Sequence, residues 1–304
     1  MAVVEAPVLE APTTFGGRVA RAFARSPLHI ALIGLAIIWL VPTVGLAITS
    51  LRPASDIHAT GWWHIFSHLG SLNFHNYGRV IHSTGMGHAF LNSIYITLPS
   101  TILPLTLGAL AAYAFAWIPF PFRDTIFLLI VALMVVPIQL ALVPLLKMFH
   151  EWHLNTPHLG IGILAYLGLW FAHTAFGLPL AIFLLRNFFI TLPKDLIEAA
   201  RMDGASNFAI FRRIVVPLSV PALASFGIFQ FLWVWNDLLM ALTLIADPGR
   251  KPMTVQITNL LSGYGQEYDL LSAASFLLMI VPLIVFFALQ RYFVQGLLAG
   301  SVKT

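Results

Sequence analysis

The side chains that could do chemistry in this chain form no recognisable catalytic set. The sequence contains no Gly-x-Ser-x-Gly nucleophile elbow, no His-Glu-x-x-His zinc motif and no Gly-x-x-x-x-Gly-Lys-Ser/Thr phosphate-binding loop. It also contains no cysteine, so disulfides and thiolate metal sites are excluded. We therefore predict no catalytic residue and no enzyme activity for this chain, and we expect it to bind no cofactor of its own.

Two histidines give a pattern that could suggest a metal. His64 and His68 are four residues apart, which would place both on one face of a helix, where they could bind zinc. No third ligand follows at a suitable spacing, so we predict no metal site. His173 lies within a long apolar run, and we interpret it as a packing residue between helices and not as a proton relay.

A second group of polar residues lies inside an apolar segment. Asp237 follows Asn236, and Gln230 and Trp233 precede it by one to two helical turns. An ionisable group within a membrane span is costly, so it usually faces a cavity or a partner. Amide, carboxylate and indole groups together suit a sugar, which presents hydroxyls and apolar C–H faces. Two interpretations stay open: these four residues line a substrate path, or they form a hydrogen-bonded cluster that holds helices together.

The most informative segment, residues 191–213, is predicted to form a short helix, a break and a second helix. Pro193 suits the start of the first helix. Gly204 can adopt the left-handed conformation that ends a helix. Ser206 or Asn207 can cap the helix that follows.

The same segment has the composition of a docking surface. It mixes small side chains, which let another protein surface approach, with charges that fix the register of the contact. Helices that rest on lipid are usually far more basic on their polar face. We therefore predict that this segment docks on a cytoplasmic partner and does not simply lie on the membrane surface. The residues predicted to make the contact are Glu198, Ala199, Ala200, Arg201, Asp203, Gly204 and Ala205.

The composition indicates what must position these residues. Apolar residues make up 59% of the 304-residue chain and charged residues 9%, and the mean hydropathy is +0.88. A soluble domain has roughly 25% charged residues, so we expect this chain to be surrounded by lipid. We predict an all-α polytopic membrane helical bundle of about six transmembrane helices. The apolar runs long enough to span a bilayer lie near residues 28–50, 88–117, 125–149, 159–189, 214–245 and 270–294.

The basic residues predict the orientation of the bundle. If the chain begins inside the cell, most Lys and Arg residues fall in cytoplasmic segments, and this bias places both termini in the cytoplasm. Residues 1–27 are then a cytoplasmic arm and residues 296–304 a cytoplasmic tail. The loop from about Arg52 to Gly87 lies outside, and its aromatic residues predict a short helix at the membrane interface. The net charge of +4 is not gathered into a basic stripe, so we expect no nucleic-acid partner.

Three stretches of the chain resemble one family of transport proteins. The run Glu-Ala-Ala-x-x-Asp-Gly-Ala at 198–205, with Ile214 and Pro217 at the expected distance, resembles the EAA loop of permease subunits from binding-protein-dependent ATP-binding-cassette (ABC) importers. The stretches 233–237 and 290–303 resemble the carbohydrate branch of these permeases. The chain is most similar to the six-span maltose-type permease that is sometimes called the G subunit.

The resemblance implies a type I ABC importer permease fold in the bacterial cytoplasmic (inner) membrane. Residues 198–204 would form the coupling helix that sits in a cleft of an ATP-binding subunit, and the tail from Gly296 would reach the same subunit. The expected partners are a dimer of ATP-binding subunits that holds ATP and Mg²⁺, a homologous permease and an extracytoplasmic sugar-binding protein. The cargo would be a disaccharide or another small glycoside. Importers of phosphate, peptides or amino acids, and a carrier that works alone, are the alternatives.

Overall fold

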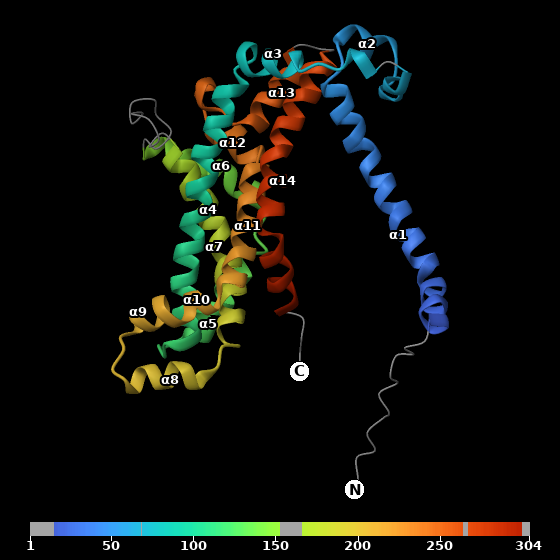
Figure 1. Cartoon of the computed structure of the whole chain (residues 1–304). Coiled ribbons are helices and arrows are strands. Elements are labelled where there is room, and N and C mark those ends of the chain that lie inside the picture. Colours follow the sequence, from blue (N-terminus) through green and yellow to red (C-terminus); the bar gives the residue numbers. More distant parts are fainter. Residues whose placement is uncertain (1–14, 68, 153–165, 264–266, 300–304) are drawn as a thin grey trace.

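The described part of the chain is a bundle of α-helices (Figure 1). The computed structural model describes residues 15–67, 69–152, 166–263 and 267–299, and no β-strand occurs in these ranges. Four helices contain stretches that are long and apolar enough to cross a membrane: α1 (Phe15–Ser50), α4 (Met86–Trp117), α7 (Leu167–Phe189) and α14 (Tyr268–Ala299). Two bent helix pairs complete six candidate spans, which confirms the prediction of an all-α bundle with about six transmembrane helices.

The first bent pair is broken at a proline. Helices α5 (Arg123–Leu133) and α6 (Ile138–Glu151) meet at an angle of 96°, and Pro137 immediately precedes α6. Proline has no N–H and disfavours helical backbone in the residue before it, so a helix that reaches this point ends.

The second bent pair lies nearer the C-terminus. The helical stretch of α9 (Asn207–Ile210), η5 (Phe211–Val215) and α10 (Val216–Leu218) meets α11 (Val220–Trp235) at 78°. Pro221 lies in the first turn of α11, where the missing N–H costs no helical hydrogen bond. The sequence predicted a span near 214–245 that contains Pro217 and Pro221. The structure breaks this segment at Ser219, ends α11 at Trp235 and continues with α12 (Leu239–Leu244).

The ends of the bundle also differ from the predicted boundaries. Helix α1 begins at Phe15, inside the segment predicted as an arm, and α14 continues to Ala299, inside the predicted tail. Hydropathy indicates which residues can lie in lipid, but a helix can continue into water beyond them. Residues 1–14, 153–165 and 300–304 lie outside the described ranges, and with them the start of the predicted span 159–189.

Short helices cover one end of the bundle, at the top of Figure 1. We call this the cap end; it consists of α2 (Ala54–Ala59), η1 (Trp62–Ser67), η2 (Leu69–Ser71), α3 (His75–Ser83) and α13 (Met253–Gly263). The buried Arg52 side chain donates hydrogen bonds to the carbonyl oxygens of Asp56 (2.9 Å) and Thr60 (3.2 Å). The buried Asn76 amide donates to the carbonyl oxygens of Ser50 (3.0 Å) and Arg52 (2.8 Å), so α3 is fixed to the end of α1.

Helices α4 and α7 pack closely because small residues face each other. A Cβ atom added at Gly108 of α4 would lie 2.5 Å from the Cβ atom of Ala181 in α7, far inside van der Waals contact. Small residues let two helix backbones approach in this way, which is a common device between helices in membranes. This pair forms the centre of the bundle, and α11 packs against both α4 and α7.

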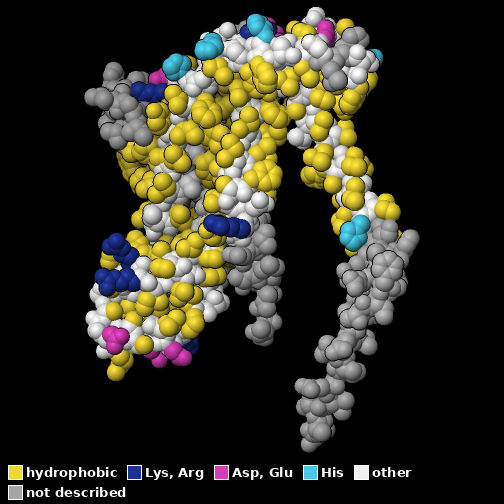
Figure 2. All heavy atoms as spheres, viewed as in Figure 1, with side chains coloured by type: hydrophobic (Ala, Val, Ile, Leu, Met, Phe, Trp, Pro, Cys, Tyr) yellow, Lys and Arg dark blue, Asp and Glu magenta, His cyan; other side chains and the backbone are white. Residues whose placement is uncertain are grey.

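The surface of the molecule has the pattern of a membrane protein. Figure 2 shows hydrophobic side chains over most of the middle, while most charged side chains lie towards the two ends. Helix α1 diverges from the other helices (Figure 1), and its large apolar side chains from Leu28 to Val44 are exposed. In water such a surface would be strongly unfavourable, so it requires lipid or an apolar partner.

Candidate functional site

The loop predicted to dock on a partner projects from the end of the bundle opposite the cap, which we call the loop end. Its helix α8 (Lys194–Met202) begins after Pro193, as predicted, and lies across the ends of the spans (Figure 1). Ile197 is 1% exposed and packs in a buried cluster with residues of α4 and α7, among them Tyr113 and Leu185. This side chain is therefore the apolar anchor of α8.

Gly204 ends α8 with the backbone conformation that the sequence predicts. Its φ angle is +76°, in the left-handed region that L-residues rarely adopt. Its N–H donates to the carbonyl of Arg201 (3.0 Å), and the N–H of Ala205 donates to that of Ala200 (3.0 Å). This pair of bonds is a Schellman motif, which satisfies the last carbonyls of the helix. The hydroxyl of Ser206 then accepts from the N–H of Ala209 (3.2 Å) and caps α9.

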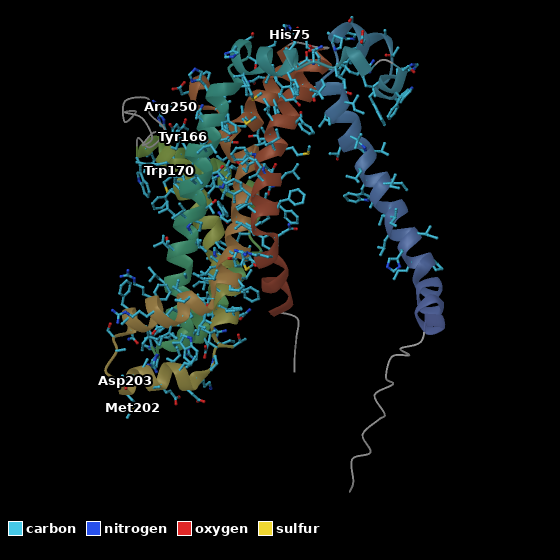
Figure 3. The ribbon with its side chains drawn as sticks, in the orientation of Figure 1. His75, Tyr166, Trp170, Met202, Asp203 and Arg250 are labelled. Atoms are coloured by element: carbon cyan, nitrogen blue, oxygen red, sulfur yellow. The ribbon has the colours of Figure 1, made fainter. Side chains whose placement is uncertain are left out.

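The tip of this loop is exposed and presents both charges and apolar side chains. Of the predicted contact residues, Ala200 and Ala205 are half-buried, and the other five are exposed. The sequence analysis missed Met202 and Leu196, which are 88% and 47% exposed. Figure 3 shows Met202 and Asp203 at the loop end, far from His75 at the cap. Helix α8 carries three large apolar side chains, of which one anchors it, and the other two were the signal that could have identified them.

Arg201 makes a contact within the chain as well. Its Nη2 atom donates to the carbonyl oxygen of Trp117, the last residue of α4, at 2.7 Å. The last carbonyls of a helix have no helical partner and carry its partial negative charge, so a guanidinium group is a favourable ligand for them.

Gln230, the first of the four polar residues predicted in a substrate path, is 2% exposed. Its amide nitrogen lies 3.1 Å from the carbonyl oxygen of Ser100 in α4 and 3.4 Å from that of His173 in α7. A Cβ atom added at Gly177 would lie 2.7 Å from the Gln230 Oε1 atom. Gln230 therefore links three helices through hydrogen bonds.

Asp237 lies in the short connection between α11 and α12 and caps α12. Its carboxylate oxygens accept from the N–H groups of Ala241 (3.0 Å) and Met240 (3.3 Å) in α12. The Nε2 atom of the buried His173 lies 3.8 Å from the Asp237 Oδ2 atom. A carboxylate at the N-terminus of a helix is favoured by the unpaired N–H groups and the helix dipole.

Trp233 and Asn236 lie differently from these two residues. Trp233 is half-buried and makes an edge-to-face contact with the ring of His173, with the centroids 5.6 Å apart. Asn236 is exposed, and its amide donates to the carbonyl of Leu232 at 2.7 Å.

Trp233 also lines a groove of about 550 Å³ at the bend between α5 and α6. The other lining residues are Leu133, Met134, Val135, Val136, Pro137, Ile138, Ala141, Ala175, Phe176 and Pro179. All of these are apolar. The bend lies at Pro137, one of the prolines within the predicted span 125–149, where a kink is expected. No group of three or more His, Asp or Glu residues that could hold a metal occurs in the described ranges, which exclude His68.

A lipid-exposed bundle with bent spans, a groove at a bend and a helix–glycine–helix loop at one end is the architecture of a multi-pass membrane permease subunit. Comparison with known proteins agrees. Residues 104–298 match the model of the family described as binding-protein-dependent transport system inner membrane component. This chain belongs to that family.

Two relatives show how much of the chain is shared. The osmoprotective compounds uptake permease protein GgtD of Synechocystis sp. is 53% identical over 282 residues, which cover 91% of this chain and 92% of that protein. The alpha-glucoside transport system permease protein AglG of Rhizobium meliloti is 51% identical over 229 residues, or 75% of this chain and 60% of that protein.

A solved structure shares the fold. It is a chain of a bacterial ABC transporter involved in the import of the acidic polysaccharide alginate, with a TM-score of 0.73 and 20% identity. The match covers 90% of this chain and 98% of that one. The permease fold of ABC importers predicted from the sequence is thereby confirmed.

Proposed function

We propose that this chain is the sugar-translocating permease subunit of an ABC importer whose energy comes from ATP hydrolysis in separate subunits. The observation that carries the proposal is the loop-end helix α8. It is anchored on the bundle by Ile197, ended by Gly204, and presents Met202 and charged side chains away from the bundle. A membrane protein that worked alone would have no use for such an exposed projection.

The cargo that best fits is a neutral disaccharide or another small glycoside. Relatives named for alpha-glucosides, arabinooligosaccharides and melibiose, raffinose and stachyose support a sugar. The groove supports an uncharged one, because its described lining residues include no ionisable side chain and do include the indole of Trp233. Aromatic faces suit the apolar C–H face of a sugar ring. Gln230, Asn236 and Asp237 are not among the residues that line the groove, so in this proposal Trp233 makes the contact with sugar.

Three kinds of partner follow from the proposal. A dimer of ATP-binding subunits, which holds ATP and Mg²⁺, would receive α8 at the loop end. A second, homologous permease would cover part of the apolar surface that this chain leaves exposed, including the open side of the groove. An extracytoplasmic binding protein would deliver sugar to the cap end; a solved alginate importer related in fold was crystallised with a pentasaccharide-bound periplasmic protein.

The orientation follows from the same assignment. The loop end would face the cytoplasm of a bacterial cell and the cap end the opposite side of its inner membrane. The start of α1 and the end of α14 lie towards the loop end in Figure 1, which supports two cytoplasmic termini. The excess of basic residues in the segments assigned to this side agrees with the positive-inside rule.

The transport cycle would use α8 as a lever. ATP binding closes the ATP-binding dimer, which displaces α8; the spans packed on α8 then turn the groove outward to receive sugar. Hydrolysis and release of the dimer return the groove to the cytoplasm. This chain binds no nucleotide in that cycle; its own residues bind sugar, transmit movement and seal the path.

Affinity purification of the chain from its native membrane tests the proposal. We expect an ATP-binding subunit and a second permease to be recovered with it, together with ATPase activity. Gly204→Val should uncouple hydrolysis from uptake, because a β-branched residue at φ +76° is strained and distorts the end of α8. Gly78→Val is the control, since a side chain at Gly78 also meets open space and the φ angle there is not positive. Recovery of the chain alone, still transporting sugar, would contradict the proposal.

A further inference from the structure

Arg201 and Ile197 form two attachments on one face of α8. They are four residues apart, so their side chains lie one above the other on the helix. Ile197 enters the buried cluster between α4 and α7, and Arg201 donates to the carbonyl of Trp117 at the end of α4. A single apolar anchor would let α8 pivot about Ile197. A second, directional attachment one turn away fixes the direction of the helix as well as its position.

The residue that Arg201 holds is directly followed by a stiff connector to α5. Residues 118–122 contain Pro119 and Pro121, whose rings fix the backbone φ angle. Phe122, which precedes α5, has a φ angle of +59°, in the left-handed region that a bulky residue rarely adopts. Phe115 of α4 packs against Phe120 of the connector, with the ring centroids 5.4 Å apart.

Further contacts hold α5 on its neighbours. The ring of Phe127 in α5 lies 5.8 Å from that of Phe115 in α4 and 6.4 Å from that of Phe183 in α7. The Arg186 guanidinium of α7 lies over the Phe127 ring at 4.1 Å, a cation–π contact, with Asp124 at 3.8 Å. Helix α5 then leads, through residues 134–137, into the wall of the groove.

We propose that Arg201 is a positioning residue that makes α8 and α5 move together, so that displacement of α8 reaches the groove. The connection runs from Arg201 to the Trp117 carbonyl, through the connector to α5, and ends at the bend beside Trp233. This inference about Arg201 rests on the proposed function, since it assigns a mechanical role to one residue of the loop that would dock on the ATP-binding subunit. Arg201 therefore faces the bundle and acts on the coupling between ATP and sugar, whereas Met202 and Glu198 face the partner.

The test uses the complete reconstituted importer and the variant Arg201→Met, which keeps the length of the side chain and removes its donors. We expect the ATP-binding subunit to remain bound and ATPase activity to persist, while sugar transported per ATP falls on the order of tenfold. Arg201→Lys should restore much of the ratio, because an ammonium group can still donate to the Trp117 carbonyl. Lys194→Met is the matched control; it removes a positive charge from the exposed first turn of the same helix and should leave the ratio unchanged.

A distance measurement separates coupling from mere stability. The chain has no cysteine, so spin labels at Asp195→Cys in α8 and Thr125→Cys in α5 are specific when the partner subunits are cysteine-free. We expect one narrow distance distribution that is the same with and without trapped nucleotide, and a broad, nucleotide-dependent one in Arg201→Met. A wild-type sugar-to-ATP ratio or an unchanged narrow distribution in Arg201→Met would overturn the inference. Failure of the unmodified chain to bind any ATP-binding subunit would instead refute the proposed function, and the label distance in the chain alone would still test the attachment.

Discussion

Replacing Ile197 by alanine should release α8 from the bundle without unfolding the spans. Ile197 is 1% exposed and is the buried residue of α8. Truncating a buried isoleucine costs ~2–5 kcal/mol, and the cost is smaller where the surroundings can collapse into the cavity. Since α8 lies at the edge of the bundle, we expect roughly 2–3 kcal/mol, borne by the local docking of α8. At tenfold per ~1.4 kcal/mol, the population of detached α8 rises by about 30- to 150-fold.

Hydrogen exchange of the backbone amides measures this population directly. We expect the amides of 194–202 in Ile197→Ala to exchange faster by that factor, while those of α4 and α7 keep their protection. Leu196→Ala removes the same number of carbon atoms from a neighbouring side chain that is 47% exposed. It should change the free energy of detaching α8 by less than about 0.5 kcal/mol. Its main effect should be weaker retention of the ATP-binding subunit. Equal exchange rates in the two variants, or loss of protection throughout the bundle in Ile197→Ala, would refute the assignment of Ile197 as the local anchor.

Three further predictions concern the bundle. Gly108→Leu should destabilise the bundle by ~1–3 kcal/mol or more, because even a Cβ atom would lie 2.5 Å from the Cβ atom of Ala181. Thermal unfolding in detergent measures this loss. Gly34→Leu is the control, because a Cβ atom added at Gly34 meets nothing within 4 Å. Trp233→Ala should raise the sugar concentration for half-maximal uptake by about tenfold, a loss of ~1.4 kcal/mol of binding free energy, and Trp233→Phe should have an intermediate effect. Asp237→Asn should lower the unfolding temperature, because it weakens the cap of α12, and should leave the concentration for half-maximal uptake little changed. Equal uptake curves for Trp233→Ala and the unmodified chain would remove Trp233 from the substrate path.

The helix–glycine–helix structure of the loop at 191–213 could be predicted closely because it is local. Pro193 starts α8, Gly204 ends it and Ser206 caps the next helix, and each of these effects depends on residues within one or two turns. The charges were predicted to face a partner, and the sequence could not indicate that Arg201 also bonds to Trp117. The two residues are 84 positions apart, and nothing in their local patterns relates them.

The candidate substrate residues could be predicted as a group but not by role. A polar cluster within an apolar run was evident from Gln230 to Asp237. The fold gives its members different surroundings: Gln230 bonds to two neighbouring helices, Asp237 caps α12, and Trp233 faces the groove. The hydrogen bonds of Gln230 and Asp237 fit the interpretation of a cluster that holds helices together. That Trp233 lines a substrate path stays a prediction.

The sequence by itself determined that this protein lies in lipid, the approximate number of its spans and the position of the helix–glycine–helix loop at 191–213. These properties depend on composition and on short-range patterns: the scarcity of charge, the length of each apolar run and the turn chemistry of Gly204. Only the tertiary structure decided the angles at which the spans bend, which member of the cluster from Gln230 to Asp237 lines the groove, and which residue connects α8 to α4. Those properties depend on contacts between helices far apart in the chain, and the free energy of such a contact is set by a neighbour that no local pattern identifies.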